Sequence, residues 1–74
     1  MNETDPLILF GQTLRKLRKR AGMNQEEVAH LAQLDRTYIG GVERGERNVS
    51  LKNICRIASA LNAHPRELFD FVIE

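Results

Sequence analysis

Helix start signals recur along this chain at short intervals, and they limit every element to a few turns. Asp5-Pro6 combines an N-cap residue with a proline suited to the first helical position. Asn24 stands three residues before Glu27, which is the spacing of a capping box. No segment alternates between apolar and polar residues over the length of a strand. The sequence therefore predicts an all-α fold, a compact five-helix domain, whose three remaining helices begin near Asp35, Ser50 and His64-Pro65.

Between these signals, apolar residues recur every three or four positions, so that each segment has one side to bury. Gly22 and Gly45 follow two of the apolar runs at positions suited to a left-handed helix stop. The core predicted from this spacing consists of Phe10, Leu14, Leu17, Ala21, Val28, Ala29, Leu31, Ala32, Ile39, Val42, Leu51, Ile54, Cys55, Ala58, Leu61 and Leu68.

The chain has 74 residues, enough for one modest core, and we expect a single domain over residues 1–74. Apolar residues make up 42% and charged residues 28%, which is typical of a globular domain and not of a disordered chain. Cys55 is the only cysteine, so no intrachain disulfide can form and a reducing, cytoplasmic setting is expected. No apolar run has the length of a membrane span or of a signal peptide, and we expect no membrane partner.

Positive charge is concentrated in the middle of the chain. Residues 15–47 carry eight Lys or Arg against five Asp or Glu, a local charge of +3, whereas the whole chain carries only +1. Five of these bases lie between Arg15 and Arg20. This distribution is compatible with a polyanionic partner, and equally with a solvated helix face.

The segment Asn24 to Gly45, "NQEEVAHLAQLDRTYIGGVERG", has two short helices joined by a very short connection, the layout of a helix-turn-helix. With the later "SLKNICRIASALNAHPRELF", it makes the chain resemble Cro/repressor-type helix-turn-helix proteins over nearly its whole length. Within that group, "LDRTYIGGVERGERNVSL" is most similar to the controller proteins of restriction–modification systems. One departure is Gln33, which stands in the tight turn where the family often has glycine. Either the domain tolerates a strained left-handed glutamine there or the turn has another geometry.

The resemblance implies a lambda-repressor-like DNA-binding fold and a sequence-specific regulator that binds double-stranded DNA at its own promoter. It further implies a homodimer on a pseudo-palindromic operator, with RNA polymerase as a further partner. A phage-type repressor and an antitoxin-like interaction module are the alternative functions on the same fold. Enzyme chemistry has little support, because His30, Cys55 and His64 have no zinc-ligand spacing and no glycine-rich phosphate loop is present. We therefore expect no catalytic residue, no metal and no cofactor.

Gly40 and Gly41 interrupt an otherwise helical pattern at a cost of about 0.5–1 kcal/mol each relative to alanine. Helical spacing places them opposite the core residues Ile39 and Val42. If this segment is the recognition helix, the missing Cβ atoms allow its backbone to approach DNA closely. The alternative is a frayed or interrupted helix.

Base contacts must then come from side chains beside the glycines. Arginine suits bidentate contacts with guanine, and threonine suits a base edge or a thymine methyl group. Tyr38 has a core role as an equal alternative, and solvated side chains are the alternative for Arg44 and Arg47. Gln25, at the positive start of the second helix, can hold a phosphate. The predicted DNA-binding residues are Gln25, Arg36, Thr37, Tyr38, Gly40, Gly41, Arg44, Arg47 and Asn48.

Two further predictions concern pairing within and between chains. By resemblance, Arg18 should form an ion pair with Glu43 and hold the third helix against the first. The chain ends in the apolar "LFDFVIE", from which Leu68 is expected to turn inward. A dimerisation surface is predicted at about residues 62–74, unless these residues only close a monomeric core; its contact residues are Phe69, Val72 and Ile73.

Overall fold

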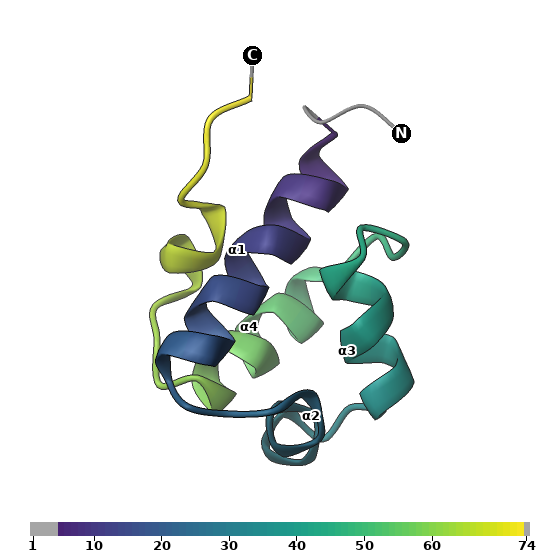
Figure 1. Ribbon diagram of the computed structural model, residues 1–74, viewed down its shortest axis with the longest axis vertical. Helices are drawn as coiled ribbons and strands as arrows, with labels where there is room; N and C mark the ends of the chain where they lie inside the picture. Colours follow the sequence, from purple (N-terminus) through teal and green to yellow (C-terminus); the bar gives the residue numbers. More distant parts are fainter. Residues whose placement is uncertain (1–4, 74) are drawn as a thin grey trace.

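The computed structural model describes residues 5–73, which form four α-helices and one 3-10 helix and contain no strand. The ends of the predicted domain, residues 1–4 and 74, lie outside the described residues. In chain order (Figure 1) the elements are α1 (Pro6–Arg20), α2 (Gln25–Ala32), α3 (Arg36–Glu43), α4 (Leu51–Ala60) and the 3-10 helix η1 (Pro65–Phe69).

The prediction of five helices is therefore too high by one α-helix. The fifth segment, η1, is a 3-10 helix of five residues that Pro65 opens and that ends before Asp70. The Glu67 N–H donates to the His64 carbonyl at 2.9 Å, a bond that spans three residues instead of four. The segment has only five residues, so it completes little more than one turn and closes it with the tighter 3-10 hydrogen bond.

Three of the predicted N-caps form with their side chains. Asp5 accepts from the Leu7 N–H at 2.8 Å, and Ser50 accepts from the Asn53 N–H at 3.2 Å. Asn24 forms the full capping box with Glu27. Asp35 occupies the N-cap position of α3, but its side chain makes no capping hydrogen bond.

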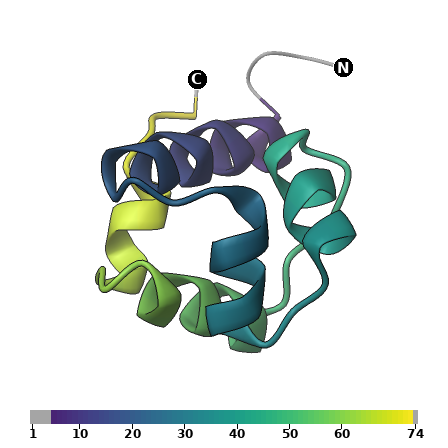
Figure 2. The ribbon, with the colours of Figure 1, turned by 60° about the horizontal axis from the view of Figure 1, so that its bottom comes forward.

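The helices surround one core. Figure 2 shows α1, α3, α4 and η1 arranged around the molecule, with α2 lying across the face turned toward the viewer. α2 packs against both α3 and α4, while α1 packs against α3 and η1. The recognition-helix candidate α3 is thus held from two sides, by α1 and by α2.

Most of the predicted core is buried, with Leu14, Val28, Ile39 and Leu68 fully enclosed. Ile57 is fully buried as well, although the sequence analysis did not single it out. Four predicted core residues are exposed instead: Ala21, Leu31, Leu51 and Cys55. Ala21 lies past the end of α1, and Leu31 lies at the margin of the buried stripe of Val28, Ala29 and Ala32 on α2. Leu51 and Cys55 are four residues apart on α4, so they share a stripe beside the buried one. The apolar stripes predicted from the sequence were thus too wide.

Within residues 5–73, no helix is long and apolar enough to cross a membrane. The same residues contain no group of three His, Cys, Asp or Glu side chains placed to hold a metal ion.

Candidate nucleic-acid interface

The turn between α2 and α3 is built around Gln33, which adopts the left-handed conformation with φ 58° and ψ 42°. The Leu34 N–H donates to the Ala29 carbonyl at 2.8 Å and closes the end of α2. A non-glycine residue in this conformation costs about 1–2 kcal/mol. Of the two alternatives left by the sequence, the domain therefore adopts the strained one, and the turn keeps the geometry that glycine would allow.

α3 presents its first turn to solvent. Arg36 and Thr37 are exposed, while Ile39 and Val42 on the opposite side are buried in the core. The two side chains predicted to contact base edges therefore lie together at the outward start of α3.

The far end of α3 is tied to α1 by the ion pair that the resemblance implied. The Arg18 guanidinium donates to the Glu43 carboxylate through Nε at 2.6 Å and Nη2 at 3.0 Å, and through Nη1 to the Met23 carbonyl at 2.9 Å. The side chains of Arg18 and Glu43 are only 10% and 5% exposed. The hydrogen bond to Glu43 raises the pKa of Arg18. Arg18 thus belongs to the core and not to the solvated basic cluster.

Gln25 is the third member of this network. Its side-chain Nε2 donates to Glu43 Oε1 at 3.1 Å, which links the first turn of α2 to the last turn of α3. The sequence assigned this side chain to a phosphate, and nothing in the spacing indicated the contact with Glu43. The Gln25 N–H remains at the positive start of α2.

Gly40 and Gly41 lie within a continuous helix, which excludes the frayed-helix alternative. Both glycines are buried, but side chains from the outer surface cover them, not the core. A Cβ at Gly40 would lie 3.1 Å from Arg44 Nη1, and one at Gly41 would lie 3.1 Å from Arg47 Cγ. The outer surface of α3 at the two glycines, which was predicted to be open to DNA, is therefore covered by two arginines of the same chain.

These two arginines make further contacts close to the glycines. Arg44 Nε donates to Glu46 Oε2 at 3.1 Å, and the guanidinium of Arg47 lies 5.8 Å from the centre of the Tyr38 ring. The Tyr38 hydroxyl accepts a hydrogen bond from Asn53 Nδ2 at 3.2 Å. The Arg44 hydrogen bond lowers the pKa of Glu46, and the same bond raises that of Arg44. Tyr38 is half-buried, so it serves as a platform for Arg47 as well as a core contact.

At Gly11, which the sequence analysis did not single out, α1 lies against the backbone of α3. A Cβ at Gly11 would overlap the carbonyl oxygen of Val42 and lie 2.7 Å from that of Glu43. Glycine is needed there because the end of α3 lies directly on the backbone of α1. The sequence signal that could have predicted this close contact is the single glycine inside the helical pattern of α1.

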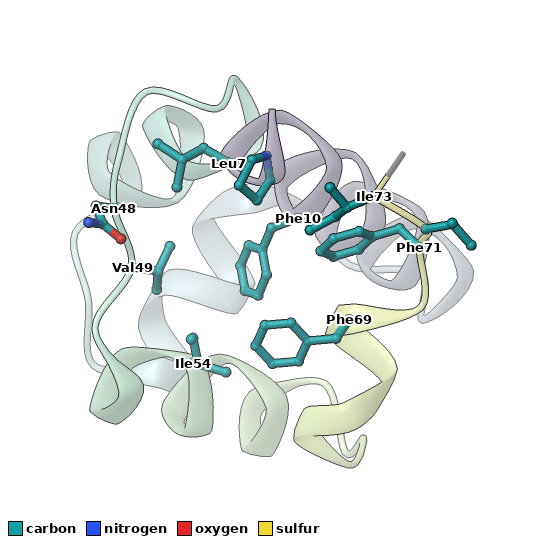
Figure 3. Close-up of a pocket in the computed structure, with 10 residues that line it drawn as sticks. Leu7, Phe10, Asn48, Val49, Ile54, Phe69, Phe71 and Ile73 are labelled. Carbon is teal, nitrogen blue, oxygen red and sulfur yellow. The ribbon is translucent and has the colours of Figure 1, made fainter. Parts of the chain in front are cut away.

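An apolar cleft of about 610 Å³ lies between α1, α4 and the C-terminal segment. Figure 3 shows Phe10, Phe69 and Phe71 around it, with Asn48 at its margin. The rings of Phe10 and Phe69 are 5.5 Å apart, and those of Phe69 and Phe71 are 6.3 Å apart. Leu68 is fully buried, as expected, whereas Phe69, Val72 and Ile73 are 49%, 79% and 59% exposed. The cleft is thus an apolar surface distinct from the buried core. Phe71 lines it, although the sequence analysis did not single out this residue.

Comparison with known proteins identifies the architecture. A helix-turn-helix family model matches residues 14–68. The control protein C.BamHI of Bacillus amyloliquefaciens is 49% identical over 65 residues, which span 86% of this chain and 80% of the relative. The control protein C.MunI of a Mycoplasma species is 46% identical over 66 residues, 88% of this chain and 89% of the relative.

Solved structures agree with this assignment. The restriction–modification controller protein C.AhdI from Aeromonas hydrophila superposes with a TM-score of 0.84 at 60% identity, over 85% of this chain and 96% of that chain. A structure of C.Esp1396I bound to a 25 base pair operator site superposes with a TM-score of 0.78 at 36% identity, over 86% and 84% of the two chains. Both proteins are regulators and not enzymes. The chain therefore belongs to the helix-turn-helix family and, within it, to the restriction–modification controller proteins.

Proposed function

We propose that this protein is a homodimeric transcriptional regulator that binds an operator at its own promoter and controls a restriction–modification operon. The observation that carries the proposal is the position of α3. This helix exposes Arg36 and Thr37 to solvent, and the ion pair between Arg18 and Glu43 fixes it to α1. A structurally similar controller, C.Esp1396I, is known bound to operator DNA. The protein acts in the cytoplasm, together with the DNA.

In this proposal the contacts divide by position along α3. Arg36 and Thr37 enter the major groove and read base edges. Arg44, Arg47 and Asn48, beyond the end of α3, approach the phosphates. The positive start of α2, at the Gln25 N–H, holds a further phosphate. The Tyr38 ring lies against the Arg47 guanidinium. Gly40 and Gly41 carry no side chain, so the backbone of α3 can approach the DNA once Arg44 and Arg47 extend to the phosphates.

A second copy doubles the contact surface. The apolar cleft and the exposed side chains of Phe69, Val72 and Ile73 beside it are the surface through which a second copy would associate. A two-fold dimer places two recognition helices about 34 Å apart, one turn of duplex, and so selects a pseudo-palindrome.

RNA polymerase is the further partner that we propose. The outer side of α2 exposes Glu26 and Glu27 close to Leu31, which is 55% exposed. An acidic surface with one apolar side chain, on the helix beside α3, suits a basic protein surface bound to the adjacent DNA.

The function is tested by selecting bound duplexes from a random pool and footprinting the native upstream region. We expect a pseudo-palindromic site, and affinity that falls steeply with salt. An antitoxin-like module would instead retain a protein partner and protect no upstream site. Absence of protection at any concentration that saturates C.Esp1396I on its operator would contradict the proposal.

Truncation of the base-reading side chains should relax specificity. Arg36→Ala and Thr37→Ala are each expected to cost about 1–3 kcal/mol of specific binding and to relax preference at particular base pairs. Competition among single-base operator variants measures this. Arg56→Ala, on the exposed side of α4, removes the same charge and should leave the base preference unchanged. An Arg36→Ala protein with the wild-type preferred site and affinity would contradict the assignment.

A side chain introduced at Gly40 should weaken operator binding without lowering the stability of the fold. Gly40→Leu is expected to leave thermal stability equal or higher, because helix propensity improves and the nearest obstacles are side-chain ends of Arg44 and Gln25, not backbone. Operator affinity should fall sharply, since leucine then occupies the surface that approaches DNA. Gly11→Leu is the matched control, which should destabilise the fold because the obstacle there is backbone. A large loss of melting temperature in Gly40→Leu would show that Gly40 is packed inside.

A further inference from the structure

The hydroxyl of Tyr38 makes one hydrogen bond, and it makes that bond as an acceptor. Asn53 Nδ2, on α4, donates to the Tyr38 oxygen at 3.2 Å, and both side chains are half-buried. Within residues 5–73, no atom accepts the O–H proton of Tyr38. Because a phenol can donate one hydrogen bond while it accepts another, its donor remains available to a group outside the chain.

Tyr38 lies at one margin of the outer face of α3. On that side Arg47 covers Gly41, and its guanidinium lies 5.8 Å from the centre of the Tyr38 ring. The other margin faces α2, because a Cβ at Gly40 would lie 3.5 Å from Gln25 Oε1. A helix in the major groove has a phosphate backbone on either side of it. In the proposed complex, the start of α2 therefore faces one strand, and Tyr38 with Arg47 faces the other.

We propose that Asn53 is a positioning residue, which holds the Tyr38 oxygen as an acceptor so that the O–H of Tyr38 donates to a DNA phosphate beside Arg47. The inference rests on the proposed function. Asn53 acts through Tyr38 and does not itself contact the DNA. A hydroxyl that accepts a hydrogen bond is polarised and becomes a better donor, and a phosphate oxygen is a strong, charged acceptor.

The first test is a double-mutant cycle on operator affinity, measured by fluorescence anisotropy. Tyr38→Phe removes the donor and should weaken binding at least about tenfold per half-site, as expected for a hydrogen bond to a charged group. Asn53→Ala keeps the phenol but leaves it unoriented, and should weaken binding about threefold per half-site. In the Tyr38→Phe background, Asn53→Ala should weaken binding no further.

The fold should tolerate both substitutions, and thermal melts check this. Asn53→Ala keeps the backbone N–H that donates to the Ser50 cap, and it improves helix propensity. If Asn53 only packs α4 against α3, its truncation will weaken operator binding equally with Tyr38 and with Phe at position 38. That result would overturn the proposal.

The second test measures the direction of the hydrogen bond in the free protein. Tyr38 is the only tyrosine, so the tyrosine Raman doublet reports this phenol alone. The wild type should show the intensity ratio of a phenol that accepts a hydrogen bond. In Asn53→Asp the carboxylate can only accept, so the ratio should shift to that of a strong donor. Operator affinity should then fall below that of Asn53→Ala, because the phenol proton is already bound.

Ser59→Asp is the matched control, since it adds the same negative charge on the exposed side of α4, near its far end. It should leave the doublet unchanged and lower operator affinity far less than Asn53→Asp does. A wild-type doublet typical of a phenol that donates strongly and accepts nothing would mean that Asn53 is the acceptor, and would overturn the proposal. A wild type that does not prefer its operator would instead refute the proposed function, whatever the doublet shows.

Discussion

Replacing Glu43 with alanine is expected to remove about 3–5 kcal/mol from the free energy of unfolding. The Arg18 side chain, which is only 10% exposed in the intact protein, is left without its carboxylate partner. Gln25 loses its acceptor at the same time. Domains of this kind have about 5–15 kcal/mol in total, so the variant should unfold at far lower urea concentration. Urea denaturation followed by circular dichroism measures the change.

A double-mutant cycle assigns this loss to the pair. Arg18→Ala, Glu43→Ala and the double variant should show strong coupling, because the second truncation removes a charge that the first left unpaired. The same cycle on the exposed Arg44–Glu46 pair is the control and should show little or no coupling, because solvent screens the two charges. Zero coupling between Arg18 and Glu43 would mean that they do not fix α3 together.

Placing a charge in the C-terminal cleft should produce a folded monomer with very weak operator binding. Two half-sites bound together gain about 10²–10⁴-fold over one, and a monomer forfeits that gain. Phe69→Asp tests this, but Phe69 also packs on Phe10 at 5.5 Å, so part of its effect will be loss of stability. Val72→Asp, at a side chain that is 79% exposed, isolates association from folding.

Sedimentation and binding to duplexes with one or two half-sites measure both effects. The proposal requires a wild-type dimer at micromolar concentration that prefers the two-site duplex. A wild-type chain that stays monomeric at high micromolar concentration, and binds one half-site as tightly as two, would eliminate the dimer.

Local features of the fold could be predicted because their signals lie within a few residues of one another. The Asn24 capping box needs only Glu27 three positions later, and the stops at Gly22 and Gly45 both have positive φ. Leu68 was expected to turn inward from the apolar C-terminal segment, and it is fully buried. Helical spacing finds the centre of a buried stripe, but its margins depend on neighbours, which is why Leu51 was misplaced.

The candidate site was predicted less completely because its decisive contacts join distant segments. Gln25 reaches Glu43 across 18 positions, and no local pattern encodes that hydrogen bond. Arg44 covers Gly40 from one helical turn further on, but Arg47 covers Gly41 only because the chain turns back after Gly45, which a helical wheel does not represent. The residue types needed for DNA recognition were therefore visible in the sequence, but their positions in the free protein were not.

The adjacent positions Phe10 and Gly11 give α1 a role in operator geometry. Phe10 lines the C-terminal cleft, and Gly11 lies on the carbonyl groups at the end of α3. In a dimer formed through that cleft, the contact of α1 with the dimer partner (at Phe10) and its contact with α3 (at Gly11) would lie on neighbouring residues of one helix. In such a dimer, the distance between the two half-sites would depend on how closely α1 approaches the end of α3, which Gly11 sets.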